Sequence, residues 1–118
     1  MDGQENQLQC LCVELLNSII DLSQAVQKKG ETYLSDRLLR SATEIGVRVF
    51  QACGGLGAAA FGDRLDSALS YVNETVFLLT VLLCRKLIAK EDFCRVETLC
   101  SKIRCMLRAM LSGVRVVR

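Results

Sequence analysis

The chain of 118 residues has no histidine, no proline and no tryptophan. Without histidine it lacks the commonest general base and the commonest metal ligand, which excludes Ser-His-Asp, Cys-His and histidine-metal sites. The lack of proline and of Asn-Gly turns argues against a β-sandwich or barrel, since those folds need many tight turns. We therefore expect a nearly all-helical chain with few routes to catalysis.

Apolar residues make up 51% of the chain, charged residues make up 24%, and the net charge is +2. This composition is too apolar and too weakly charged for a disordered protein. With only two tyrosines and four phenylalanines, the interior must be filled mostly by aliphatic residues and cysteine. The length predicts one domain spanning residues 1–118.

The seven cysteines are odd in number and include no C-x-x-C pair, so they do not form a disulfide framework. The spacing of Cys94, Cys100 and Cys105 does not bring the three thiols to one face of a helix. Cys10 and Cys12 point about 200° apart on a helix, so one of them should be exposed. We interpret most of the thiols as small buried apolar groups, and we expect no metal and no cofactor.

No segment is predicted to enter or cross a membrane. The N-terminal stretch carries Asp2 and Glu5 and no basic residue before Lys28, which is the reverse of a signal peptide. The most apolar stretch, Thr75–Cys84, is ten residues long, whereas about 20 are needed to cross a bilayer. We interpret this stretch as part of a buried helix, and we predict a cytoplasmic protein.

Apolar residues recur at spacings of three and four over residues 6–28, 33–53, 62–87 and 91–112, which predicts four helices. Gly30 follows the first segment, Gly54, Gly55 and Gly57 follow the second, and Gly113 follows the last. Helices of this length joined by short links must run antiparallel to their chain neighbours. The predicted fold is an all-α, antiparallel, up-and-down four-helix bundle. Residues 76–83 are apolar on all sides of their helix, so one facing partner cannot cover them.

Two helical motifs are notable. The second segment carries Leu34, Leu38, Arg40, Ser41, Ile45, Gly46 and Val49, and the third carries Ala68-Leu69 followed by Asn73-Glu74-Thr75. With Lys90–Phe93, these motifs resemble the small four-helix-bundle proteins encoded in ribosomal RNA intervening sequences, to which accessory proteins of diversity-generating retroelements are related. The resemblance covers about residues 8–113.

The resemblance implies a ring-like homo-oligomer, typically a pentamer. For the retroelement relatives it also implies a basic surface that engages a reverse transcriptase and RNA or DNA. The chain departs from the family pattern at Arg37, Glu44, Arg48 and Gln51-Ala52, where the family has Gln, Ser, Asn and Glu-Gly. These changes rewrite the polar cluster of the second helix.

Charge is unevenly distributed, with −4 over residues 1–27 and +5 over residues 98–118. One interpretation is that the first and last helices simply attract each other. The other is that basic helix faces contact phosphates. The candidate contacts are Arg37, Arg40, Arg48, Arg104, Arg108 and Arg115.

The last three of these arginines lie within about 40° of one another on a helix and form a ridge roughly 17 Å long. Arg40, Glu44 and Arg48 form an i, i+4 ladder that equally suits a solvated face. An isoelectric point near 8.2 and the absence of interleaved aromatics argue against a dedicated nucleic-acid binder.

Two further features concern packing. Asn73 and Glu74 are predicted to form a buried polar pair, partnered by Arg48 or Arg40, because an unpaired carboxylate is costly in an apolar helix. Val47 and Phe50, with Leu39, lie off the main apolar face of the second helix and predict a subunit interface.

We predict a non-enzymatic, oligomeric scaffold that binds nucleic acid and a partner protein, such as a reverse transcriptase, through its basic helix faces. The alternative is a purely structural homo-oligomer with no nucleic-acid role. A third hypothesis, from a different class, is an enzyme with a carboxylate or thiol centre.

Overall fold

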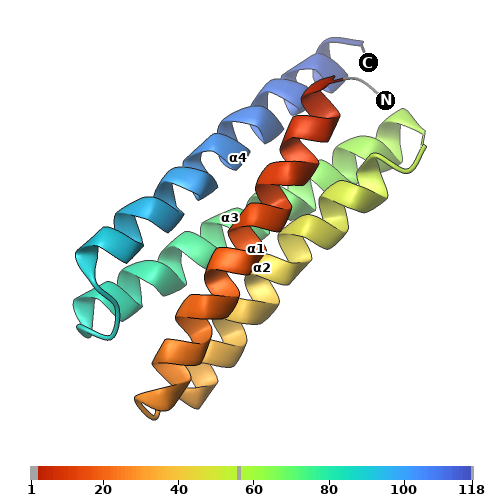
Figure 1. Ribbon diagram of the computed structural model, residues 1–118. Helices are drawn as coiled ribbons and strands as arrows, with labels where there is room; N and C mark the ends of the chain where they lie inside the picture. Colours follow the sequence, from red (N-terminus) through yellow and green to blue (C-terminus); the bar gives the residue numbers. More distant parts are fainter. Residues whose placement is uncertain (1–2, 56, 118) are drawn as a thin grey trace.

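The structure is a computed structural model that describes residues 3–55 and 57–117, without the side chains of Ala58 and of residues 114–117. It contains four helices, namely α1 (Gly3–Lys28), α2 (Thr32–Ala52), α3 (Ala58–Cys84) and α4 (Lys90–Val117). No strand occurs within the described ranges. The predicted all-α four-helix bundle is confirmed (Figure 1).

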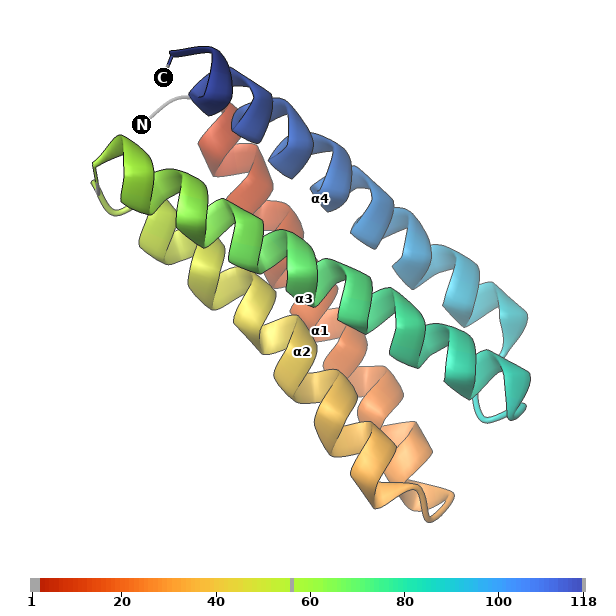
Figure 2. The same ribbon diagram turned by 180° about the vertical axis from the view of Figure 1, so that it is seen from behind.

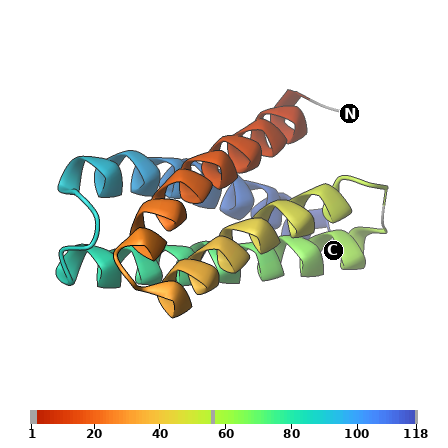
Figure 3. The same ribbon diagram turned by 60° about the horizontal axis from the view of Figure 1, so that its bottom comes forward.

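The helices form two antiparallel hairpins, α1–α2 and α3–α4, that pack against each other at an angle (Figures 1 and 2). Each helix packs on its chain neighbours, and α1 also packs on α4. Across the described part of the chain, the backbones of α1 and α3, and those of α2 and α4, do not come close to each other, so these pairs lie on the diagonals of the bundle. Figure 3 shows α1 lying obliquely across the other helices of a molecule that measures 47 × 21 × 20 Å.

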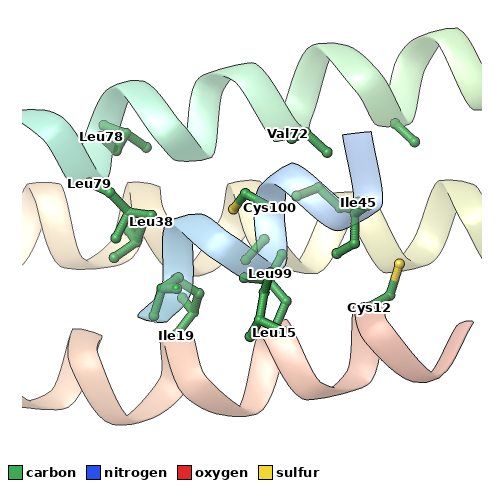
Figure 4. Packing of buried hydrophobic residues seen from close by; sticks show 14 of the residues in the cluster. Cys12, Leu15, Ile19, Leu38, Ile45, Val72, Leu78, Leu79, Leu99 and Cys100 are labelled. Carbon is green, nitrogen blue, oxygen red and sulfur yellow. The ribbon is translucent and has the colours of Figure 1, made fainter. Parts of the chain in front are cut away.

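The core runs along the inner faces of all four helices. Its members recur at spacings of three and four because such residues share one side of a helix. Figure 4 shows several of them pointing inward, among them Leu15, Ile19, Leu38, Ile45, Val72, Leu79, Leu99 and Cys100. Leu15, Ile19, Leu38, Ile45 and Leu79 are fully buried.

The predicted boundaries of three helices need correction. The helix α1 begins at Gly3 rather than residue 6, and α3 spans Ala58–Cys84 rather than 62–87. The end of α3 is set by Lys86, whose φ of 61° is left-handed, while the N–H of Leu87 donates to the Leu82 carbonyl. A left-handed residue with such a hydrogen bond ends a helix, because the bond provides a donor for one of the last carbonyls of the helix.

The helix α4 continues to Val117, past the predicted end at residue 112. A glycine inside a helix costs only about 1 kcal/mol relative to alanine. Gly113 therefore does not stop the helix.

We expected the apolar stretch of α3 to be buried on all sides, but it is not. Leu78, Leu79 and Leu82 are buried, but Phe77 is 66% exposed. By length and composition alone, Ala59–Cys84 is also apolar enough to cross a membrane. This is weak evidence for a membrane span, because the core helix of a soluble protein passes the same test of length and composition.

Candidate nucleic-acid interface

A groove between α2 and α3 combines cations, aromatic rings and one carboxylate. It is lined by Tyr33, Arg37 and Arg40 from α2, and by Tyr71 and Glu74 from α3. Its volume is about 430 Å³. Residues three or four apart lie on one face of a helix. The α2 and α3 sets therefore each form a row, and the packing of the two helices brings the rows together.

Arg37 is held in place in the groove by two polar contacts. Its Nε donates to Glu74 Oε2 at 3.2 Å, and its Nη1 donates to the Tyr33 hydroxyl at 3.0 Å. The hydrogen bond to Tyr33 and the charge of Glu74 both raise the pKa of Arg37, so the guanidinium stays cationic. Arg40 is exposed and makes no ion pair with any described residue. The groove therefore offers one oriented cation and one unpaired cation.

Arg48 lies against the same helix pair but is already engaged. Its Nη2 is 3.2 Å from Glu44 Oε1, and its guanidinium carbon lies 5.9 Å from the centre of the Tyr71 ring. The Arg48–Glu44 part of the predicted ladder is present, while Arg40 does not pair with Glu44. Arg48 stabilises the α2–α3 packing through a cation–π contact.

The predicted buried pair of Asn73 and Glu74 is wrong. Asn73 is exposed and the Glu74 side chain is partly exposed, because the buried positions of this turn are Val72 and Thr75. The partner of Glu74 is Arg37, and neither Arg40 nor Arg48. Glu74 therefore needs no buried partner and belongs to the open groove.

Sequence reasoning missed a buried hydroxyl pair behind this groove. Ser41 Oγ lies 2.8 Å from Thr75 Oγ1. Both hydroxyl oxygens also lie within hydrogen-bond distance of the Tyr71 carbonyl oxygen. Both side chains are fully buried. Their signal was a small hydroxyl residue at a core-facing position of each helix. The pair fixes how α2 lies against α3, and thus the shape of the groove.

The six predicted arginine contacts do not form one surface. Arg37, Arg40 and Arg48 lie on α2, whereas Arg104 and Arg108 lie on α4, which is diagonal to α2 in the described structure. Arg108 is exposed, but Arg104 is half-buried and its Nε is buried without a partner.

The side chain of Arg115 lies outside the described residues. The predicted ridge on α4 is therefore only partly visible.

A separate apolar groove lies between α1 and α2. It has a volume of about 270 Å³ and is lined chiefly by Val13, Leu16, Gly46, Val47 and Phe50. Val13, Val47 and Phe50 are 50%, 38% and 49% exposed. The off-core position predicted for Val47 and Phe50 is thus present in the structure. An exposed cluster of large apolar side chains is typical of an interaction surface.

The cysteines are less buried than we predicted. Only Cys12 and Cys100 are buried, and burial raises the pKa of each thiol to about 12. Cys10 is exposed and Cys12 is buried, which confirms the expected split. Cys84, Cys94 and Cys105 are exposed as well. Among the described residues, no group of three or more acidic or cysteine side chains is placed to hold a metal ion.

Comparison with known proteins gives two findings. The model of the 23S rRNA-intervening sequence protein family matches residues 4–109. A crystal structure from Bacteroides thetaiotaomicron, described as a protein with unknown function from the S23 ribosomal protein family, is 25% identical in sequence and superimposes with a TM-score of 0.88. That similarity covers 92% of this chain and 98% of the other. No curated protein matches the sequence.

Proposed function

The chain belongs to the 23S rRNA-intervening sequence protein family, and from that premise we propose that it is a non-catalytic cytoplasmic scaffold that binds single-stranded nucleic acid in the α2–α3 groove. The observation that carries this proposal is the meeting of Arg37 and Arg40 with the exposed ring of Tyr33. Proteins that bind single strands combine cations for the phosphates with aromatic rings on which bases stack.

The groove places aromatic rings beside its basic residues, although aromatic residues do not interleave with basic ones along the sequence. Along the α2 sequence, Tyr33 stands alone beside the arginines, but the packing of α3 adds Tyr71 to the same groove. Tyr33 is 67% exposed, so its ring is open to a base. Arg40 has no competing acidic partner among the described residues and is free to contact a phosphate.

Fluorescence anisotropy with a labelled single-stranded RNA tests this assignment. We expect the double variant Arg37→Ala/Arg40→Ala to weaken binding at least tenfold, and to reduce the slope of log affinity against log salt by about 1.4, or about 0.7 per lost phosphate contact. The control is Arg85→Ala/Arg95→Ala, which removes the same charge from two exposed, ion-paired arginines outside the groove. Equal losses in the two double variants would contradict a defined groove.

The basic surface of α4 provides a second arm of this experiment. If the groove is the contact surface, Arg104→Glu/Arg108→Glu should weaken RNA binding less than Arg37→Glu/Arg40→Glu does. The opposite order would place the contact on α4 and overturn the assignment to α2 and α3. Both double variants change the net charge equally, so bulk charge cannot produce the difference.

Self-association through the apolar α1–α2 groove is a second candidate role, favoured by the exposure of Val13, Val47 and Phe50. It corresponds to the structural homo-oligomer, and the ring and the pentamer remain predictions. Phe50→Glu should convert the assembly to monomers in sedimentation velocity experiments, while Gln51→Glu, an equal charge change at the neighbouring exposed position, should not. A wild-type protein that is monomeric at micromolar concentration would refute this role.

A reverse transcriptase as the protein partner rests on the resemblance to retroelement accessory proteins. That relation and that partner remain predictions. Co-purification of the two proteins in the presence of nuclease is the direct test.

A further inference from the structure

The carboxylate of Glu74 is unexpected in a groove that otherwise suits an anionic strand. It lines the groove together with Arg37 and Arg40, and its side chain is 31% exposed. A negative charge here opposes phosphate binding. One of its oxygens, Oε2, accepts the Arg37 hydrogen bond, whereas Oε1 has no donor among the described residues. The groove thus presents a free, acceptor-only atom beside its cations.

From this arrangement we propose that the groove selects guanine, with Glu74 accepting hydrogen bonds from the edge of an unpaired base that stacks on Tyr33. The inference rests on the proposed function and names the base that this site would take. Guanine presents its N1–H and N2–H₂ donors side by side on the Watson–Crick edge, which is the edge read in single strands. A carboxylate accepts hydrogen bonds and donates none.

The other bases fit this carboxylate less well. Adenine and cytosine place one amino donor next to a ring nitrogen acceptor, and uracil places its single N–H between two carbonyl acceptors. An acceptor that faces a carboxylate oxygen is left unpaired and repelled. Guanine therefore gains two charge-assisted hydrogen bonds where uracil gains at most one.

The groups around Glu74 are placed to hold a base at this position. Tyr33 is the open stacking surface, because Tyr71 is only partly exposed and has the guanidinium of Arg48 over its ring. Arg37 bonds to both Tyr33 and Glu74, so it fixes the ring and the carboxylate relative to each other. Arg40 remains available for the phosphate of the same nucleotide. The base and the phosphate of one nucleotide thus each have a named contact.

The test compares four single-stranded RNA octamers by fluorescence anisotropy at one salt concentration. One octamer is all uridine, and the others carry a single central guanine, adenine or cytosine. We expect the guanine octamer to bind wild-type protein about tenfold more tightly than the uridine octamer, which corresponds to about 1.4 kcal/mol. This comparison uses only wild-type protein, so a misfolded variant cannot account for a negative result.

Substitution then assigns the selectivity to a residue. Glu74→Gln should reduce the preference for guanine to within about twofold while salt-dependent binding persists. Glu44→Gln is the matched control, because Glu44 is also ion-paired and 28% exposed but does not line the groove. It should keep the full preference.

The outcomes separate the two proposals. Equal affinity for all four octamers, lost in Arg37→Ala/Arg40→Ala, would overturn guanine selection and leave the proposed function standing. A guanine preference that persists unchanged in Glu74→Gln would also overturn the inference. Failure of every octamer to bind would overturn both the inference and the proposed function.

Discussion

The buried hydroxyls of Ser41 and Thr75 provide a direct test of how α2 is held against α3. Thr75→Val keeps the shape of the side chain, and it leaves Ser41 Oγ with the Tyr71 carbonyl at 3.0 Å. Ser41→Ala leaves Thr75 Oγ1 with the same carbonyl at 2.8 Å. Because neither remaining hydroxyl loses its last partner, we expect each substitution to lower the free energy of unfolding by only about 1 kcal/mol, a typical net value for one hydrogen bond.

The double variant shows how many hydrogen bonds the two hydroxyls make together. They carry two protons, so their 2.8 Å contact with each other and their two contacts with the Tyr71 carbonyl provide at most two hydrogen bonds at once. Each single substitution removes one of these bonds and the double variant removes both, so we expect the double loss to equal the sum of the single losses, about 2 kcal/mol, within about 0.5 kcal/mol. Urea unfolding followed by circular dichroism measures all four proteins.

The control for this cycle combines Thr75→Val with Ser35→Ala. The Ser35 hydroxyl is also buried, but it donates to the Ser23 carbonyl on α1 at 2.8 Å and shares no partner with Thr75. The losses in this control pair should add within about 0.5 kcal/mol. A single substitution at Ser41 or Thr75 that costs as much as the double variant would refute this reasoning, because the remaining hydroxyl would then have lost its bond to the Tyr71 carbonyl.

Three further predictions concern the backbone and the thiols. Lys86 has a left-handed φ of 61°, which glycine adopts more easily. Lys86→Gly should therefore increase the free energy of unfolding by about 0.5–1 kcal/mol and raise the unfolding temperature. An unchanged melting curve would contradict this. The raised pKa values of Cys12 and Cys100, about 12 against an ordinary 9.0, mean that the folded state keeps protons which the unfolded chain loses above pH 9. Stability should be full below pH 9 and fall by about 1 kcal/mol per thiol near pH 10, a loss that Cys12→Ala/Cys100→Ala should remove in urea titrations. Mass spectrometry after brief treatment with iodoacetamide at pH 8 should show alkylation at Cys10 before Cys12 or Cys100, and equal labelling would show that the buried thiols are accessible.

The fold was readable from the sequence because core residues such as Leu38 and Ile45 recur at helical spacing between glycine-containing links. The orientation of α3 was not readable, since residues 76–83 are apolar on every side and the pattern cannot show that Phe77 faces outward. The same ambiguity misplaced Asn73 and Glu74. The position of an exposed residue on such a helix is decided by packing against its neighbours.

The site was only partly readable for a related reason. Arg37 and Arg40 stood out as basic residues of α2, but the partners of Arg37 come from both its own helix and α3. Glu74 is 37 residues away in the chain, and the contact depends on the register of α3 against α2. Spacing within one helix predicts which residues share a face, whereas it does not predict which two faces meet. The combination of cations, rings and carboxylate is therefore a property of the assembled pair of helices.

The order in which the helices pack has a consequence for how the chain folds. Apart from α1 against α4, every pair of packed helices is consecutive in the chain, and the α1–α4 contact is the least extensive. Most native contacts can therefore form without closing a long loop, which is the slow step in topologies rich in distant pairings. Such a chain should fold in microseconds to milliseconds. The last helix, α4, packs least extensively against the rest of the bundle. We therefore expect its amides to be the first to lose protection in native-state hydrogen exchange.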